Sequence, residues 1–205
     1  MSTMETPAFF DAVAPIVLAD PLADLLGAAD AGRLEYRYLD VVKLAGHSCP
    51  TVAGAWLMTR AALARLYGDE LPQRGEIRVE LRQPIDDGVT GVIAGVAGMV
   101  TGAANEGGFK GLAGRFSRQG LLRFGVPMAG EIRFTRLDTG RSVELAHHPQ
   151  SVPRPATLPT LMQQALARHA DAATRKAFGQ AWQGWVRTIL LEHADDPAVI
   201  AIVAD

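Results

Sequence analysis

Apolar residues between positions 50 and 67 fall on one broad face of a helix. They are Val52, Trp56, Leu57, Leu63 and Leu66. This spacing, with arginines elsewhere around the helix, is typical of an amphipathic helix packed on a core. Proline suits the first turn of a helix, so Pro50 places Ser48 or Cys49 near the N-cap. The pattern therefore predicts a helix over 50–67 that begins directly after Cys49.

Further helices are predicted at both ends of the chain. Residues 7–18 and 20–29 have the pattern of two short helices, which we expect to form a lid or a dimer arm. A proline-rich linker covers 149–159. Two amphipathic helices follow it, at about 160–169 and 171–192.

Alternation of polar and apolar residues predicts strands in the middle of the chain. They cover Leu34–Lys43, Glu76–Leu81, Leu121–Phe124, Glu131–Leu137 and Ser142–His147. The turn Asp138-Thr139-Gly140-Arg141 joins the last two as a hairpin. Residues 198–203 form a final strand or a docked tail. These elements predict an α+β fold, in which a mixed or antiparallel sheet packs with helices.

The same elements suggest how the chain is divided. We expect residues 1–150 to form the α+β domain with its N-terminal helical arm. Residues 151–205 then add a C-terminal helical segment packed on that domain.

The segment from Gly88 to Ala104 carries no charge and contains five glycines at intervals of three and four residues. It is shorter than the roughly 20 apolar residues that a membrane-spanning helix needs, so a buried helix is predicted. The intervals place all five glycines on one helical face. A glycine costs a helix about 1 kcal/mol relative to alanine. We therefore expect this face either to pack closely on another element or to hold a ligand.

Composition narrows the classes of partner. The chain has 205 residues with a 48% hydrophobic and a 20% charged fraction, which argues for a folded domain and against disorder. Its net charge of −2, with acids and bases interspersed, provides no basic surface for nucleic acid or an anionic membrane. We therefore expect ions, small molecules and protein chains as partners, with no nucleic acid and no membrane.

Cys49 is the only cysteine, so the chain can form no internal disulfide. The segment Met1–Asp20 lacks the basic and then apolar pattern of a signal peptide, because Glu5 and Asp11 interrupt it. We expect a cytoplasmic protein.

His47 and Cys49 are the strongest candidates for chemistry. In a turn that leads into a helix, their side chains can converge on one metal ion. An imidazole with a thiolate suits Zn²⁺, and also Fe, Ni or Cu. A cysteine at an N-cap meets free backbone N–H groups and the positive end of the helix dipole, which favour the thiolate. Zinc sites normally use three or four protein ligands. Candidates for the others are His147, His148, Asp86, Asp87 and Glu106.

Two other interpretations of Cys49 stay open, and with them the question whether the protein is an enzyme. A cysteine before proline is a common arrangement for a thiolate haem ligand, and His47 would be a nearby alternative ligand. Cys49 is also a candidate nucleophile with His47 as its base. A second class of function is a non-catalytic module that uses Cys49-Pro50 and holds haem or another small ligand against the glycine-rich helix.

A glycine-rich loop over 105–118 is a second candidate region. Its glycines allow backbone N–H groups to turn toward an anion, and Lys110, Arg115 and Arg118 would neutralise that anion. The spacing differs from that of a Walker phosphate-binding loop. We expect the loop either to hold an anionic cofactor or substrate, chiefly through Lys110 and Arg115, or to be a mobile surface loop.

The order of motifs resembles a known family. Gly46-His47-Ser48-Cys49-Pro50 opens an alanine-rich helix, and a strand, a glycine-rich helix ending in Thr101-Gly102 and a loop with Lys110-Gly111 follow. This order, over about Asp40–His147, resembles the FmdE family, which takes its name from a component of formylmethanofuran dehydrogenase. The resemblance implies an α+β homodimer that binds a metal ion, usually taken as zinc, through His47 and Cys49.

The chain departs from the FmdE pattern at three places. Ala45 stands where members commonly have another histidine. A cysteine of the family falls near Pro84–Ile85 in this chain, and a second one falls at Ala103. Because these residues are absent, the coordination of a metal ion held by His47 and Cys49 must be completed by another group. That group is water, a bound substrate, a histidine or carboxylate, or a second copy of the chain.

Overall fold

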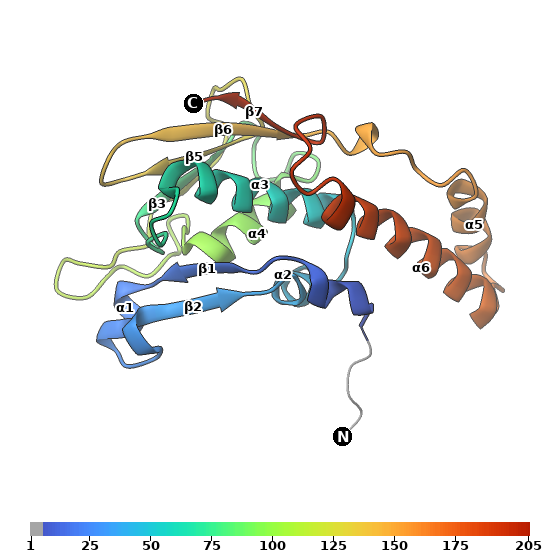
Figure 1. Cartoon of the computed structure of the whole chain (residues 1–205), viewed down its shortest axis with the longest axis horizontal. Helices are drawn as coiled ribbons and strands as arrows, with labels where there is room; N and C mark the ends of the chain where they lie inside the picture. Colours follow the sequence, from blue (N-terminus) through green and yellow to red (C-terminus); the bar gives the residue numbers. More distant parts are fainter. Residues whose placement is uncertain (1–5) are drawn as a thin grey trace.

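Residues 6–205 form three layers in the computed structural model (Figure 1). A five-stranded sheet is one outer layer. The helices α3 (Pro50–Tyr67) and α4 (Thr90–Thr101) form the middle layer, and a two-stranded sheet lies beyond them. The described residues include only part of Met1–Asp20, the segment in which we expect no signal peptide. The architecture confirms the α+β class.

The larger sheet is mixed and has the strand order β4-β3-β5-β6-β7. Its strands are β3 (Ile77–Leu81), β4 (Leu122–Arg123), β5 (Ile132–Arg136), β6 (Ser142–His147) and β7 (Ile200–Ala204). β3 and β4 run parallel, because α4 and the glycine-rich loop carry the chain back between them; the other neighbours are antiparallel. The predicted strands from residue 76 to 147 and their hairpin are confirmed. The segment 198–203 ends in an edge strand, which was one of its two expected forms.

One face of this sheet is apolar and carries the core. Alternating residues of β3, β5 and β6 are buried on the face that the helices cover, namely Ile77, Val79, Leu81, Ile132, Phe134, Val143 and Leu145. The opposite face is polar. There Arg133 lies between Glu80 and Glu144 on the neighbouring strands and forms ion pairs with them at 3.4 and 2.6 Å. The alternation that predicts the strands therefore separates the core from a charged face.

The N-terminal region differs from the two predicted helices. A 3₁₀ turn, η1 (Ala8–Ala12), replaces the first helix, and the strand β1 (Ile16–Ala19) follows it and pairs antiparallel with β2 (Arg33–Tyr36). Pro15 accounts for the error, because the residue before a proline disfavours the helical conformation. The second helix is confirmed in shorter form as α1 (Pro21–Leu25). The region therefore packs as a small sheet, with the turn η2 (Asp30–Gly32) before β2, and not as a helical arm.

The strand predicted over Leu34–Lys43 is wrong in its second half. The chain leaves β2 at Tyr36 and forms the helix α2 (Tyr38–Ala45). The Asp40 carboxylate accepts a hydrogen bond from the Arg37 N–H at 2.8 Å, which caps the first turn. Tyr38, Val41, Val42 and Ala45 lie at helical spacing and are buried or half-buried, so tertiary packing selects the helix.

The C-terminal helices are confirmed with shifted bounds. α5 (Leu158–Ala165) follows the turn η3 (Pro149–Ser151), and α6 (Ala172–Arg187) continues into a π-helical turn, η4 (Thr188–Glu192). Figure 1 shows α5 and α6 as a hairpin that projects from one end of the molecule.

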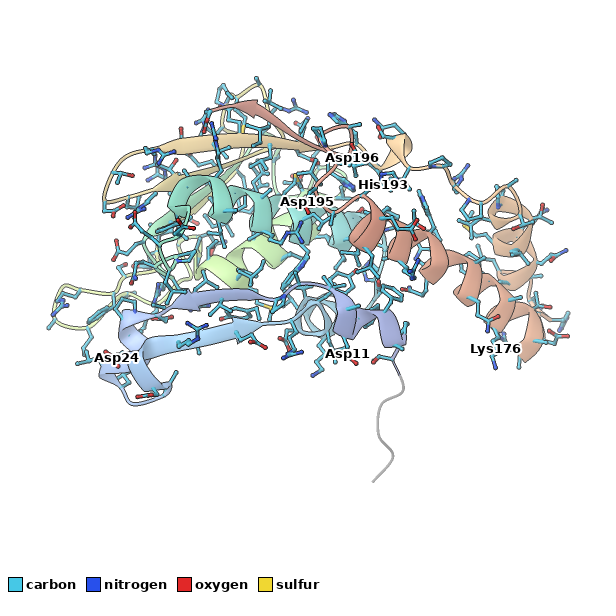
Figure 2. The ribbon with its side chains drawn as sticks, in the orientation of Figure 1. Asp11, Asp24, Lys176, His193, Asp195 and Asp196 are labelled. Atoms are coloured by element: carbon cyan, nitrogen blue, oxygen red, sulfur yellow. The ribbon has the colours of Figure 1, made fainter. Side chains whose placement is uncertain are left out.

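The chain then turns back to the sheet. Figure 2 shows His193, Asp195 and Asp196 together at this turn, beside α3. Arg60 of α3 donates hydrogen bonds there to the Asp195 carboxylate and the Ala194 carbonyl, so the turn is tied to the domain.

Among residues 6–205, no helix combines the length and the apolar character that a membrane crossing requires. α4, the uncharged helix, has 12 residues. Its glycine-bearing face is only partly packed. Gly91 and Gly95 are exposed to solvent, whereas the position of a Cβ on Gly98 would lie 2.8 Å from the carbonyl oxygen of Ala103. A Cβ on Gly91 would also lie close to a backbone carbonyl, that of Ile85, at 3.2 Å, whereas one on Gly95 would meet only the Leu44 side chain at 3.9 Å. Close packing therefore accounts for Gly98 and in part for Gly91, but not for Gly95.

Candidate functional site

His47 and Cys49 lie in the tight turn that joins α2 to α3. Gly46 ends α2 in the left-handed conformation, with φ of 75°, which glycine adopts without strain. Cys49 is the N-cap of α3 and Pro50 is the first helical residue, as the sequence predicts. His47 and Cys49 are thus the two chain neighbours of Ser48, and both lie directly before the amino end of a long buried helix.

The His47 imidazole is exposed, and one hydrogen bond orients it. Its Nδ1 lies 2.9 Å from the carbonyl oxygen of Ala45. A carbonyl oxygen only accepts hydrogen bonds, so Nδ1 is the donor, and in the neutral ring the free lone pair is then on Nε2. Histidines that bind metal ions almost always donate their other ring N–H in this way, to a carbonyl or a carboxylate. The hydrogen bond therefore favours the neutral tautomer that binds a metal ion through Nε2.

Cys49 is a half-buried free thiol whose sulfur faces the amino end of α3. Its Sγ accepts a hydrogen bond from the Val52 N–H at 3.5 Å. The free backbone N–H groups of the first helical turn and the positive end of the helix dipole lie at this end of α3. Cys49 is therefore placed where a sulfur ligand or a sulfur nucleophile is favoured.

Ser48 anchors the turn from both sides. Its Oγ lies 3.0 Å from the Tyr38 hydroxyl, and its carbonyl oxygen accepts hydrogen bonds from Trp182 Nε1 at 2.9 Å and Gln183 Nε2 at 3.0 Å. Burial raises the pKa of Tyr38 well above its ordinary value, so the phenol stays protonated. α2, α3 and α6 thus hold the turn in one conformation, and α6 is tied directly to the backbone between His47 and Cys49.

The structure places His147 against the same helix but gives it a different environment. The position of a Cβ on Gly54 would lie 2.1 Å from His147 Nδ1, so the ring occupies the space that this glycine leaves. Burial and the neighbouring His148 lower the pKa of His147 to about 4, and its buried Nε2 has no hydrogen-bond partner among the described residues. His148 is half-buried, and its backbone N–H donates to the Val199 carbonyl.

Among residues 6–205, no group of three or more His, Cys, Asp and Glu side chains lies close enough to hold a metal ion. His147, His148 and the carboxylates do not gather with His47 and Cys49 in such a group. A metal at the turn would therefore have at most two ligands from the described part of one chain.

The structure does not bring Lys110 and Arg115 to this turn. Both are exposed on the glycine-rich loop, which Figure 1 shows at the end of the molecule opposite to α6. Arg115 stacks over the ring of Phe116 at 4.7 Å. A ligand held by Lys110 and Arg115 would thus occupy a separate site from one held at His47.

Arg118, the third cation of the loop, has a structural role that the sequence did not show. Its Nη2 lies 2.7 Å from Oδ1 of the buried Asp20, whose Oδ2 lies 2.8 Å from Arg74 Nη1. The Asp20 carboxylate also caps α1, and Arg74 donates to carbonyls at the end of α4. Burial acts to raise the pKa of Asp20, but the two arginines and the cap hold it below its usual value. These three residues therefore hold the base of the loop.

The sequence did not single out three residues of the site, Tyr38, Trp182 and Gln183. Trp182 anchors the turn through its hydrogen bond to the Ser48 carbonyl. No periodic pattern in the sequence predicts the contacts of Trp182 and Gln183 with Ser48, because these residues are separated from Ser48 by 134 and 135 positions along the chain.

Neither a scan of protein-family profiles nor a search of curated proteins finds a match to this chain. The resemblance to the FmdE family therefore rests on the order of motifs between residues 40 and 147.

Proposed function

We propose that this protein binds a transition metal ion, zinc first among them and iron or nickel as alternatives, through His47 Nε2 and Cys49 Sγ. The hydrogen bond from His47 Nδ1 to the Ala45 carbonyl carries the proposal, because it presents the free Nε2 lone pair of a metal-binding histidine. Cys49, two residues further on at the N-cap, supplies a second donor suited to the same ions.

The donor set fits a metal ion that keeps open coordination positions. Imidazole and thiolate together provide two of the four positions of a zinc site, so the others are left for water, a bound molecule or a second copy of the chain. A metal ion bound in this way acts as a Lewis acid toward an oxygen atom that it holds. The protein's own contribution is the rigid turn, which Ser48, Tyr38 and Trp182 hold in place.

Elemental analysis and thermal denaturation test the proposal. The protein as purified is expected to contain a transition metal, which Cys49→Ser and His47→Ala lose. Added Zn²⁺ should stabilise the metal-free wild type by about 2.7 kcal/mol at a hundredfold excess over its dissociation constant. Substituted Co²⁺ should show thiolate-to-metal charge-transfer absorption that Cys49→Ser abolishes.

His169→Ala is the matched control, because His169 is exposed on the segment between α5 and α6. It should bind metal as the wild type does. The proposal fails if the wild type contains no metal and Zn²⁺ leaves its melting temperature unchanged. Sedimentation of the metal-loaded protein distinguishes a site completed by water, with a monomer, from one shared by the homodimer that the FmdE resemblance implies.

No contact among the described residues favours the haem interpretation over metal binding. The same purified protein separates the two, because haem bound through Cys49 gives a Soret band that shifts in Cys49→Ala. A Soret band together with an absence of transition metal beyond haem iron would replace the proposal by that alternative.

A further inference from the structure

A groove of about 620 Å³ runs between η1 and one face of α6, away from the glycine-rich loop. Phe9 lines one side, and Lys176, Gly179, Gln183, Gly184 and Arg187 belong to the other. The α6 residues follow helical spacing, so they form one continuous face. The volume lies in the range of sites for small organic molecules, and the lining is mostly apolar.

Two glycines open this groove, although no contact among residues 6–205 requires them. Gly179 and Gly184 lie in the interior of α6, where each costs about 1 kcal/mol of helix stability relative to alanine. Neither has a positive φ, and a Cβ added to either would meet no atom within 4 Å. Packing within the described residues therefore does not explain them, whereas an occupant lying on the helix backbone does.

The charges of the groove select the kind of occupant. Lys176 and Arg187 stand eleven residues apart on the same face, about 16 Å along the helix axis, and no acidic residue among residues 6–205 lines the groove. Arg187 pairs with Glu192, whereas Lys176 forms no ion pair in the part of the chain that the structure describes. Figure 2 shows Lys176 near the outer end of α6.

A second copy of α6 fits this face poorly. An antiparallel copy would bring Lys176 against the other copy's Arg187, and a parallel copy would pair each cation with itself. An apolar molecule with one negative group instead satisfies both the lining and the charge.

We propose that this groove binds an apolar organic anion, such as an aromatic or aliphatic carboxylate. Its body lies over Gly179 and Gly184, and its anionic group meets the Lys176 ammonium. Gln183 lies between this groove and the turn at His47, since it lines the groove while its Nε2 donates to Ser48. The inference does not depend on metal binding at that turn.

Fluorescence titration with 1-anilinonaphthalene-8-sulfonate, an apolar aromatic anion, tests the proposal. The folded wild type should bind one equivalent saturably and should bind the uncharged N-phenyl-1-naphthylamine more weakly. Lys176→Glu should weaken binding of the sulfonate about fivefold, as expected for a partly exposed charge contact. Arg175→Glu, the same charge change at the neighbouring residue outside the groove lining, should leave it unchanged.

Filling the groove is the second arm of the test. Gly184→Leu should abolish saturable binding while the protein stays folded, because space is open at that position. Gly184→Ala gives a similar gain in helix propensity with little filling, and it should still bind. Equal affinity in Lys176→Glu, Arg175→Glu and Gly184→Leu would overturn the proposal. So would an absence of saturable binding, or sedimentation showing that a second copy covers the groove.

Discussion

The imidazole of His147 lies on Gly54, so closely that a Cβ at Gly54 would come within 2.1 Å of Nδ1 and 2.3 Å of Cε1. One strand residue of the sheet thus occupies the space left by one glycine of α3. The contact lies on the helix that begins at Cys49, and it explains why a glycine is tolerated in the middle of a buried helix.

Gly54→Ala is expected to destabilise the protein by about 1–3 kcal/mol, because the added methyl group must displace a buried ring. Urea denaturation measures the change. The double variant Gly54→Ala/His147→Ala should recover part of the loss, since the methyl group then enters the space of the ring. Additive losses in the double variant would contradict direct contact.

The buried His147 should make stability depend on pH. Its pKa is about 4 in the folded protein and about 6.5 when unfolded, so the unfolded chain binds the proton more tightly. The contribution of His147 is fully present above pH 6.5, decreases as the pH falls, and levels off below pH 4. The total decrease is on the order of 3 kcal/mol.

Denaturation of the wild type and of His147→Gln between pH 4 and 7 measures this dependence. The difference in stability between the two should shrink as the pH falls, whereas His169→Gln, at an exposed histidine, should track the wild type. Parallel curves for wild type and His147→Gln would show that the ring is not buried in its neutral form.

Asp20 should be the most sensitive charged residue of the fold. Asp20→Asn leaves the Arg74 and Arg118 guanidinium groups without their shared anion, and loss of one member of a buried ion cluster costs about 3 kcal/mol or more. Glu35→Gln, which breaks the exposed pair of Glu35 with Arg37, should cost less than about 1 kcal/mol. Equal losses in chemical denaturation would mean that the Asp20 cluster is hydrated.

Two glycines of α4 should respond in opposite directions to the same change. Gly95→Ala is expected to stabilise by about 0.5–1 kcal/mol, because its nearest neighbour, Leu44 Cδ2, would lie at an ordinary 3.9 Å. Gly98→Ala is expected to destabilise by about 1–3 kcal/mol, because the methyl group would meet the Ala103 carbonyl at 2.8 Å. Differential scanning calorimetry measures both, and a destabilising Gly95→Ala would instead indicate a partner on the exposed face.

Local sequence patterns were sufficient to predict the helices and strands that bury one face against the core. The bounds of α3 follow from Pro50 and the apolar spacing after it, and the β5–β6 hairpin follows from alternation around a turn. The pattern failed where short elements take their structure from neighbours. β1 exists because it pairs with β2, and α2 exists because Tyr38 and Val41 enter the core.

The features of the candidate site also divide into those that the local sequence predicts and those that depend on tertiary packing. The sequence by itself determined that His47 and Cys49 lie directly before the start of a helix, because helix caps and prolines act over a few residues. Only the tertiary structure decided that α6 holds Ser48, that His147 lies on Gly54, and that the glycine-rich loop with Lys110 and Arg115 lies at the end of the molecule opposite to α6. Such distances depend on how sheet and helices pack, and contacts between residues about a hundred positions apart have no periodic signal in the chain.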